Sequence, residues 1–271
     1  MMNEIDAFIL GIIQGITEFL PVSSSGHLEI ARHILGANML SDKNLLMTTV
    51  LHFATALSTI IVFKKDIISL FDGIFLKKNK KSKSFLIKII IAIIPAGLVG
   101  LFLMEEIENL FIGNLVLVGV MLILTGVMLF LTKIIKPGIK QISKMDSLII
   151  GLSQALAIIP GISRSGSTIC TSIFLNNNKN DAAKFPFLIV IPVIFGAILK
   201  NVLEIISNYF ENGENSFLKE LDFSVLFIGF LASFTTGIFA CKLVLKVVRN
   251  NNLIYFSFYC FILGLISIFI L

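Results

Sequence analysis

Long apolar runs separated by short polar connections make up most of the chain. Six of these runs are long enough to cross about 30 Å of hydrocarbon as helices. The six runs are residues 45–63, 84–103, 111–131, 185–206, 224–243 and 253–271. The pattern predicts an all-α, polytopic membrane protein.

Two further apolar regions, 5–35 and 146–175, differ because polar residues interrupt each of them near its middle. The interruptions read Pro-Val-Ser-Ser-Ser-Gly-His at 21–27 and Pro-Gly-Ile-Ser-Arg-Ser-Gly-Ser at 160–167. Neither half of such a region is long enough to cross a bilayer alone. We therefore expect two re-entrant helix–loop–helix hairpins that enter the membrane and turn back.

The composition agrees with this prediction. Of the 271 residues, 56% are hydrophobic and 14% are charged, with a mean hydropathy of +0.96, whereas about 25% of residues are charged in an average soluble domain. These values exclude a water-soluble globule, a disordered chain, a disulfide-stapled secreted module and a nucleic-acid-binding protein. The first six residues lack the basic stretch of a cleaved signal peptide. Cys170, Cys241 and Cys260 stand apart in apolar runs, and we interpret them as packing residues.

The charged connections predict the side of the membrane on which each loop lies. The net charge is +5, and lysines cluster between apolar runs, as they do in cytoplasmic loops. The lysine-rich connections 64–83 and 132–145 are therefore predicted inside and the acidic connections outside. One acidic connection contains Glu105, Glu106 and Glu108, and the other spans residues 207–223. This assignment requires each hairpin to begin and end on one side, so that the first opens outward and the second inward.

The two halves of the chain repeat at a spacing of 140 residues. Under this shift, similar residues of the two hairpins coincide: Asp6 with Asp146, Gly11 with Gly151, Gln14 with Gln154, Ser23 with Ser163, Ser25 with Ser165 and Gly26 with Gly166. Each half holds one hairpin and three spans, and because three is odd the second half is inverted. We expect a single membrane domain over 1–271, with repeat 1 at about 1–131 and repeat 2 at about 141–271.

The two interrupting loops carry chemistry suited to phosphate. Each loop precedes a helical segment, and the N-terminus of a helix attracts anions through its free N–H groups and its dipole. Hydroxyl donors are supplied by Ser23, Ser24, Ser25, Ser163, Ser165, Ser167 and Thr168. Arg164 adds a planar charged fork, and an arginine within an apolar membrane region indicates a functional site. The alternative is that Arg164 reaches the interface and pairs with a lipid headgroup.

Titratable groups on the first hairpin complete the candidate site. Gln14 and Glu18 lie four residues apart and therefore share one helix face. A carboxylate at this depth needs a metal ion, a proton or a cation as partner, and a purely structural pairing of Glu18 with Arg164 is the alternative. His27 follows the serine loop and is suited to acid–base work near neutral pH. We interpret His33 as structural, and His52 fits packing and support of the site equally well.

These motifs are specific enough to suggest a family. The segment 14–27, Gln-Gly-Ile-Thr-Glu-Phe-Leu-Pro-Val-Ser-Ser-Ser-Gly-His, and the segment 160–168, Pro-Gly-Ile-Ser-Arg-Ser-Gly-Ser-Thr, resemble the two signatures of the undecaprenyl-diphosphatase (bacitracin-resistance) family. The order of the signatures and the chain length also fit, so the resemblance covers the full chain. The first motif position is Gln14 where the pattern also allows Glu, which leaves Glu18 as the one carboxylate there.

The resemblance implies an enzyme of the bacterial inner membrane that hydrolyses undecaprenyl diphosphate to the monophosphate and inorganic phosphate. This step recycles the lipid carrier for cell-wall synthesis and limits the target of bacitracin. It also implies a divalent cation (Mg²⁺ or Ca²⁺) as cofactor, with Glu18 as its ligand, and a homodimer. The prenyl diphosphate lipid is the expected partner. The charge pattern predicts a catalytic mouth on the extracytoplasmic side.

The roles of individual residues follow as hypotheses. Ser24 is the candidate nucleophile with His27 activating it, and Ser23 is nearly as suitable. A phosphorylated His27 or direct attack by water remain alternatives. We expect Arg164 to stabilise the phosphoryl group and Glu18 to position a metal ion or act as base. The expected substrate-binding residues are Gln14, Ser23, Ser25, Ser163, Ser165 and Thr168.

A transporter or lipid flippase is the main competing interpretation, because broken helices in inverted repeats are common in secondary transporters. A combined enzyme and flippase is also conceivable. A structural membrane protein or channel would explain neither Arg164 nor the serine loops.

Overall fold

The computed structural model describes residues 3–35, 43–103, 106–107, 109, 113–135, 138–212, 223–250 and 252–271. These ranges contain ten helices and no β-strand. The helices are α1 (Glu4–Thr17), α2 (Ser24–Leu35), α3 (Lys43–Phe75), α4 (Lys80–Phe102), α6 (Leu115–Leu131), α7 (Lys144–Leu156), α8 (Arg164–Phe174), α9 (Lys179–Asn212), α11 (Phe223–Arg249) and α12 (Ile254–Phe269). The all-α class is therefore confirmed.

Four helices are long and apolar enough to cross a bilayer, so the chain is a multi-pass membrane protein. The four spans are Leu46–Phe75, Lys80–Phe102, Lys179–Leu203 and Phe223–Arg249. Within the described part of the chain, α6 and α12 are apolar but have only 17 and 16 residues. At about 1.5 Å per residue they reach about 25 Å. Each of the six predicted runs thus contains a helix, and among the described residues four of these helices meet the length of a full span.

The long helices extend well past their apolar runs. Residues 64–83 were expected to be a loop, but α3 continues to Phe75 and α4 begins at Lys80, so that 76–79 alone connect them. Lysine is a good helix former, and a helix that leaves the hydrocarbon loses no backbone hydrogen bonds. In the same way α9 begins at Lys179, before the predicted start of its run.

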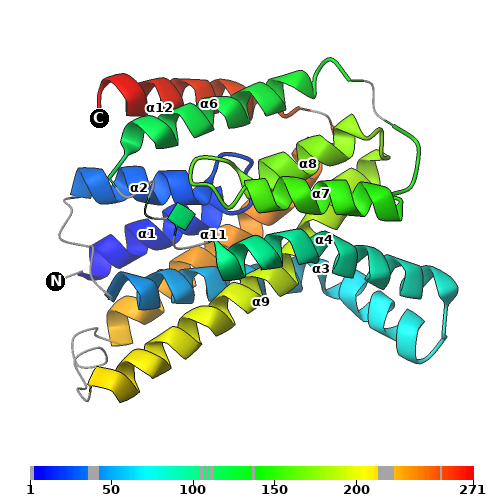
Figure 1. Ribbon diagram of the computed structural model, residues 1–271, viewed down its shortest axis with the longest axis horizontal. Coiled ribbons are helices and arrows are strands. Elements are labelled where there is room, and N and C mark those ends of the chain that lie inside the picture. The colour runs from blue at the N-terminus through cyan, green and yellow to red at the C-terminus, as the bar shows by residue number, and fades with distance from the viewer. Residues whose placement is uncertain are drawn as a thin grey trace.

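The two interrupted regions form pairs of short helices, α1 with α2 and α7 with α8 (Figure 1). The first helices of the two pairs begin with the same device. Asn3 caps α1 in a reciprocal capping box with Asp6, and Ser143 caps α7 in one with Asp146. The breaks lie at 18–23 and 157–163 and overlap the predicted interruptions at 21–27 and 160–167. Each ends earlier than predicted, because the residues from Ser24 and from Arg164 onward already form the first turns of α2 and α8.

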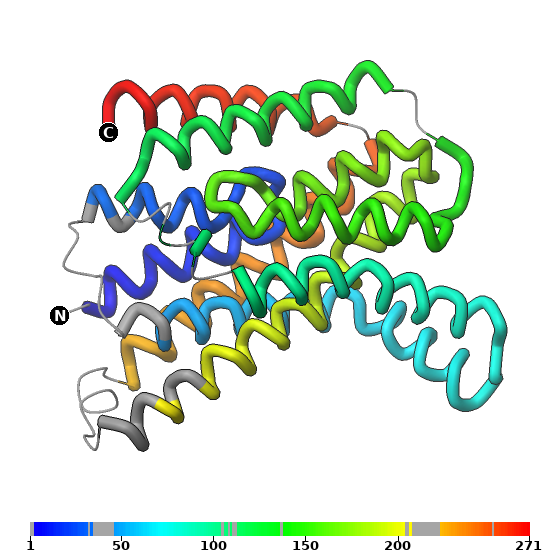
Figure 2. The backbone as a smooth tube through the Cα atoms, in the orientation of Figure 1, coloured from blue at the N-terminus to red at the C-terminus, as the bar shows by residue number. Residues whose placement is uncertain are grey.

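Helices distant in sequence pack in pairs. In Figures 1 and 2, α12 and α6 lie side by side along one edge, joined by hydrogen bonds from the Ser257 hydroxyl to the Gly126 carbonyl (2.7 Å) and from Ser267 to Leu115 (2.8 Å). Small residues and interhelical hydrogen bonds of this kind hold helices together in lipid. Helix α1 packs on α11 and α4 packs on α7.

Equivalent small residues make two of these contacts. Gly11 of α1 lies directly against Ala232 of α11, and Gly151 of α7 lies directly against Ala92 of α4. The shift of 140 residues relates Gly11 to Gly151 and Ala92 to Ala232. The two pairs are therefore equivalent contacts, and each of them joins one half of the chain to the other.

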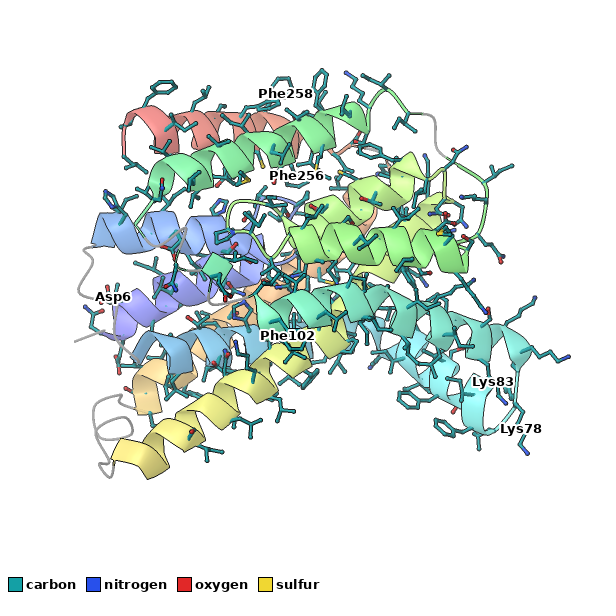
Figure 3. The ribbon with its side chains drawn as sticks, in the orientation of Figure 1. Asp6, Lys78, Lys83, Phe102, Phe256 and Phe258 are labelled. Carbon is teal, nitrogen blue, oxygen red and sulfur yellow. The ribbon has the colours of Figure 1, made fainter. Side chains whose placement is uncertain are left out.

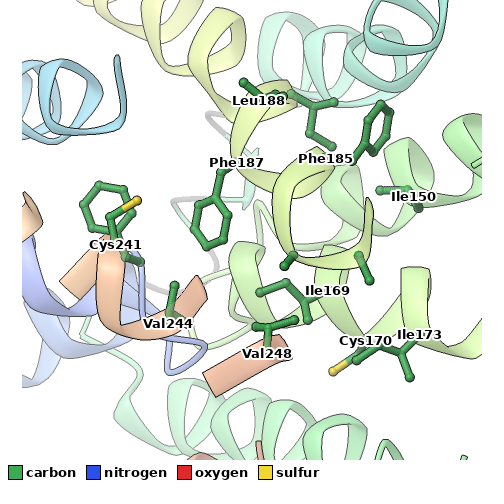
Figure 4. Close-up of a cluster of buried hydrophobic side chains, with 14 of the residues drawn as sticks. Ile150, Ile169, Cys170, Ile173, Phe185, Phe187, Leu188, Cys241, Val244 and Val248 are labelled. Atoms are coloured by element: carbon green, nitrogen blue, oxygen red, sulfur yellow. The ribbon is translucent and has the colours of Figure 1, made fainter. Parts of the chain in front are cut away.

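A large buried cluster connects the second hairpin to the long helices (Figure 4). Its members include Ile150 of α7, Ile169 of α8, Phe185 of α9 and Val244 of α11, all buried completely. The three cysteines are buried and free, and each belongs to this cluster. The cluster fixes α8, and with it the first turn that carries Arg164.

Some charge-based predictions fall outside the described residues. These are Glu105 and Glu108, Lys136, and the acidic positions 214–222. The side of the membrane on which those connections lie stays a prediction.

We predict that Gly161→Ala destabilises the second hairpin. Gly161 has a φ of 92°, and an added Cβ would lie 2.5 Å from the Val118 carbonyl oxygen and 2.6 Å from the Met121 Cβ. The backbone conformation alone costs about 1–2 kcal/mol for a residue with a side chain. Thermal unfolding in detergent should therefore begin at a lower temperature than in the unmodified protein.

Gly97→Ala is the matched control, because nothing lies within 4 Å of a Cβ added at Gly97 in α4. Its unfolding temperature should be unchanged or slightly raised. Equal stability of the two variants would contradict the argument.

Candidate active site

The second loop is held in place by one threonine of α6. The Thr125 hydroxyl donates to the Gly161 carbonyl (3.0 Å) and accepts the Ser163 N–H (3.0 Å). Thr125 is buried. These two backbone groups of the loop are thus hydrogen-bonded inside the protein, as buried backbone groups need to be.

The two loops start their following helices with the same serine arrangement. The Ser23 hydroxyl accepts the Gly26 N–H (3.2 Å), and the Ser163 hydroxyl accepts the Gly166 N–H (3.0 Å). Each capping hydroxyl also lies next to the serine two positions later, at 3.3 Å from Ser25 and 3.2 Å from Ser165. Ser23 and Ser163 are therefore helix caps, and Ser23 holds a left-handed φ of 69°.

The two loops are in contact with each other. The Ser165 hydroxyl donates to the Leu20 carbonyl of the first loop (3.1 Å). A Cβ added at Gly26 would lie 3.2 Å from the Gly161 Cα, so the two backbones come close to each other at these two glycines. The first turns of α2 and α8 therefore start from neighbouring positions. The N–H groups of these first turns have no acceptor within their own helices.

Glu18 is the centre of a polar cluster. Its Oε2 accepts a hydrogen bond from Gln14 Nε2 (3.0 Å) and one from the Ser24 hydroxyl (2.9 Å). Its Oε1 lies 3.7 Å from Arg164 Nη1 of the other hairpin, and its Oε2 lies 3.9 Å from His52 Nε2 of α3. The side chain is 5% exposed. The carboxylate is thus buried among donors and positive charge, which a buried anion needs.

Arg164 keeps one nitrogen without a hydrogen bond. Nη1 is buried and has no hydrogen-bond partner among the described residues, because 3.7 Å to Glu18 is too long for one. Buried donors are almost always paired. This donor is therefore available to an acceptor from outside the protein, and its positive charge favours an anionic one.

A small cavity opens between Glu18 and Arg164. Its volume is about 20 Å³, room for about one water molecule. Its polar wall contains Ser165 and Thr168, and Thr168 donates to the Arg164 carbonyl (2.8 Å). Its apolar wall comes from Phe19 and from Pro186, Phe187, Val190 and Ile194 of α9.

His27 lies differently from what the sequence suggested. Its Nδ1 is 2.7 Å from the Ser23 carbonyl and its Nε2 is 2.7 Å from the Tyr259 hydroxyl of α12. The two rings are stacked with their centroids 5.6 Å apart. Both ring nitrogens are engaged by these partners, and the Ser24 hydroxyl bonds to Glu18. The expected His27–Ser24 pair is not formed in this structure.

The cluster contains donors for a hard cation. The buried Gln14 Oε1 has no hydrogen-bond partner among the described residues, and Glu18, which lines the cavity, has its Oε1 3.7 Å from Arg164 Nη1. Mg²⁺ and Ca²⁺ prefer oxygen ligands, and Mg²⁺ is often held by one or two carboxylates together with substrate phosphates. Within the described ranges no group of three His, Cys, Asp or Glu residues gathers. The donor set therefore fits a cation that binds together with a phosphorylated substrate.

The structure therefore brings together Gln14, Glu18, Ser24 and Arg164, with Ser165 and Thr168 beside them. Ser23, Ser25 and Ser163 shape the loops, and His27 lies to one side. Sequence reasoning left His52 open, although it is the one titratable residue in the run 45–63. It missed Thr125 and Tyr259, because neither belongs to a motif.

Comparison with known proteins agrees with this geometry. Residues 7–266 match the family described as bacitracin resistance protein BacA. The chain belongs to the BacA family. A protein of Christiangramia forsetii named undecaprenyl-diphosphatase is 48% identical over 267 residues, with 98% of each chain covered. Proteins of the same name from Parabacteroides distasonis and Bacteroides fragilis are 43% and 42% identical over 268 residues, again with 98% of each chain covered.

We predict that His27 of this BacA-family protein is the neutral Nδ1–H tautomer and accepts a hydrogen bond from the Tyr259 hydroxyl. A carbonyl only accepts, so Nδ1 must carry the proton, and Nε2 of the neutral ring then accepts from the Tyr259 hydroxyl. Nitrogen-15 NMR of histidine-labelled protein should show this tautomer for His27. Tyr259→Phe should keep this tautomer, because the Ser23 carbonyl still requires the Nδ1 proton, but should shift the Nε2 resonance as its hydrogen bond is lost.

The chain has only three histidines, so His27→Gln assigns the signal. His52 is the internal control: its Nδ1 faces the Thr48 carbonyl at 2.8 Å, and its signal should not respond to Tyr259→Phe. An unchanged Nε2 resonance of His27 in that variant would show that the Tyr259 hydroxyl does not bond to it.

Proposed function

We propose that this BacA-family protein hydrolyses undecaprenyl diphosphate to undecaprenyl phosphate and inorganic phosphate. Its relatives carry the name undecaprenyl-diphosphatase over nearly their whole length, and the family is described by resistance to bacitracin. The observation that carries the proposal is the orphaned, buried Nη1 of Arg164 beside the Glu18–Ser24 pair. A phosphate in the cavity would supply the acceptor that Arg164 lacks.

Ser24 is the proposed nucleophile and Glu18 its base. Ser24 already donates to Glu18 Oε2 at 2.9 Å, the geometry that a proton transfer needs. The Ser24 oxygen bonds to the terminal phosphorus while the bond to the bridging oxygen breaks and undecaprenyl phosphate leaves. The hydroxyl proton of Ser24 passes to Glu18. Water then attacks the phosphorus of the phosphoserine and releases inorganic phosphate, and Glu18 returns the proton to the departing Ser24 oxygen.

The choice of Ser24 over Ser23 rests on hydrogen bonding. The Ser23 hydroxyl is occupied as the cap of α2 and is buried. The Ser24 hydroxyl faces the carboxylate. Direct attack by water activated by Glu18 is the competing route. His27, held between Ser23 and Tyr259, is assigned to fixing the loop that carries Ser24 rather than to taking its proton.

Arg164 and the two helix N-termini stabilise the negative charge. Phosphoryl transfer depends mostly on positioning and on electrostatic stabilisation of the equatorial oxygens. The Arg164 guanidinium and the first-turn N–H groups of α2 and α8 approach from both hairpins. They also offset the repulsion between a phosphate and Glu18. The apolar wall of α9 suits the first prenyl units of the lipid tail.

We assign Glu18 and Gln14 as the residues that would hold a divalent cation. When bound, such a cation would neutralise charge on the diphosphate. The support is the orphaned Gln14 Oε1 next to Glu18. With a single carboxylate, the protein's own ligand set is small, so the affinity for the cation should depend strongly on substrate.

We further propose an inverted repeat within one membrane domain. Its support is the pairing of α1 with α11 and of α4 with α7 through equivalent small residues, together with the matching serine caps. The family resemblance favours a homodimer in the bacterial inner membrane. The lysine-rich connections favour a catalytic mouth on the extracytoplasmic side. Thiol labelling of a cysteine placed near Ser24 tests that orientation.

We predict that Arg164→Ala lowers phosphate release by about 10²–10³-fold, the usual cost of removing one stabilising group of a transition state. Arg164→Lys should fall between, because lysine keeps the charge but loses the planar fork. The assay is phosphate release from undecaprenyl diphosphate by purified protein in detergent. Arg249→Ala, at the exposed end of α11, is the matched control and should keep full activity.

Near-normal turnover by Arg164→Ala would remove this arginine from the site. Transport in sealed vesicles without any hydrolysis in detergent would instead support the flippase interpretation.

We predict that Ser24→Ala and Ser23→Ala have different effects, because Ser24 is the proposed nucleophile and Ser23 is the cap of α2. Ser24→Ala should reduce turnover by at least about 10³-fold with little change in stability. Ser23→Ala should lower stability by about 1 kcal/mol, as loss of a cap does, and retain measurable activity. Mapping of phosphate trapped on the protein should identify Ser24. Full activity of Ser24→Ala would favour direct attack by water.

A further inference from the structure

A second hollow, far larger than the cavity at Glu18, opens at the lysine-rich ends of α3 and α4. Its volume is about 580 Å³. It lies between the end of α3, the start of α4, the segment before α7 and the start of α9. It shares no lining residue with the cavity at Glu18.

The hollow carries an excess of positive charge. Four lysines line it, Lys80, Lys81, Lys88 and Lys184, against two aspartates, Asp66 and Asp181. Both aspartates are engaged: Asp66 accepts from Lys184 (2.6 Å) and Asp181 accepts from the Asn178 side chain (2.8 Å). Within the described ranges, Lys80, Lys81 and Lys88 form no ion pair with either carboxylate. Three ammonium groups are therefore available to an anion.

The rest of the lining is divided between hydrogen-bonding and apolar groups. Hydroxyl and amide groups come from Ser69, Ser82, Ser84 and Gln141. Apolar side chains come from Leu70, Phe85, Ile142, Phe185 and Leu188. Phe85 meets the buried Phe185 edge to face, with ring centroids 5.8 Å apart. A site with both kinds of wall suits an amphiphile better than a free ion.

We propose that this hollow binds an anionic phospholipid, with the phosphate headgroup on Lys80, Lys81 and Lys88 and the upper acyl chain along the apolar wall. Basic pockets between membrane helices bind anionic headgroups, and each lysine near the membrane surface contributes about 1 kcal/mol. A free phosphate would use the lysines but leave the apolar wall without a partner. The two sources of the phosphate group are therefore distinguishable.

The test compares two triple variants of the full chain in neutral detergent. Lys80→Gln/Lys81→Gln/Lys88→Gln removes the charges of the hollow. Lys77→Gln/Lys78→Gln/Lys83→Gln removes three charges close to the connection between α3 and α4 that do not line the hollow. Lys78 and Lys83 lie at the outer end of this helix pair (Figure 3). Binding of phosphatidylglycerol, phosphatidylcholine and inorganic phosphate is measured for each by native mass spectrometry and by the shift in unfolding temperature.

We predict that the first variant loses affinity for phosphatidylglycerol by about ten-fold or more, while the second changes it far less. Phosphatidylcholine should bind weakly to all three proteins. Inorganic phosphate should neither raise the unfolding temperature nor displace phosphatidylglycerol. Without lipid, both variants should unfold at the temperature of the unmodified protein. If the triple variant does not fold, Lys80→Gln/Lys81→Gln, at exposed positions, replaces it.

Three results would overturn the proposal. Equal loss in the two variants would indicate attraction by overall charge rather than by the hollow. Equal binding of phosphatidylcholine would indicate an apolar surface without headgroup selection. Displacement of phosphatidylglycerol by inorganic phosphate would indicate a site for a free anion. None of these results depends on the phosphatase activity, because the hollow shares no residue with the proposed active site.

Discussion

The charge pair between Glu18 and Arg164 connects the two hairpins, and the rest of the site depends on it. A buried carboxylate costs several kcal/mol unless positive charge and hydrogen bonds compensate it. Glu18 receives hydrogen bonds from its own hairpin, through Gln14 and Ser24, but its closest permanent positive charge comes from the other one. Each hairpin therefore needs its partner at this depth. Because the two groups are 3.7 Å apart, the guanidinium can also bind a second anion.

Rigid surroundings keep the pair in position. Thr125 holds the second loop from α6, the Ser165 hydroxyl ties it to the first loop, and two serine caps begin α2 and α8. These bonds satisfy loop backbone that lipid could not solvate. They also fix the directions of Ser24 and Arg164 before substrate arrives. Such preorganisation is the main source of electrostatic catalysis.

The sequence predicted the parts of this arrangement that depend on local pattern. The helices, both breaks and the pairing of Gln14 with Glu18 follow from apolar runs, loop residues and helical spacing. Other features depend on packing between distant segments. The Tyr259 hydroxyl contacts His27 although the two residues are 232 positions apart in the sequence, and no local pattern predicts that contact. The choice between Ser23 and Ser24 depends on which hydroxyl caps α2 and which bonds to Glu18, and the run of three serines in the sequence does not distinguish them. The 64–83 loop was mispredicted because lysines are as compatible with helix as with loop.

The size of the cavity between Glu18 and Arg164 has a kinetic consequence. A space of about 20 Å³ is smaller than a diphosphate, so substrate binding would require this site to widen. Pro186 and Pro192 interrupt the hydrogen-bond ladder of α9 beside this site, where bending is easiest. Gating of this kind keeps bulk water from the reacting phosphorus. It also makes release of the monophosphate lipid a candidate for the slowest step.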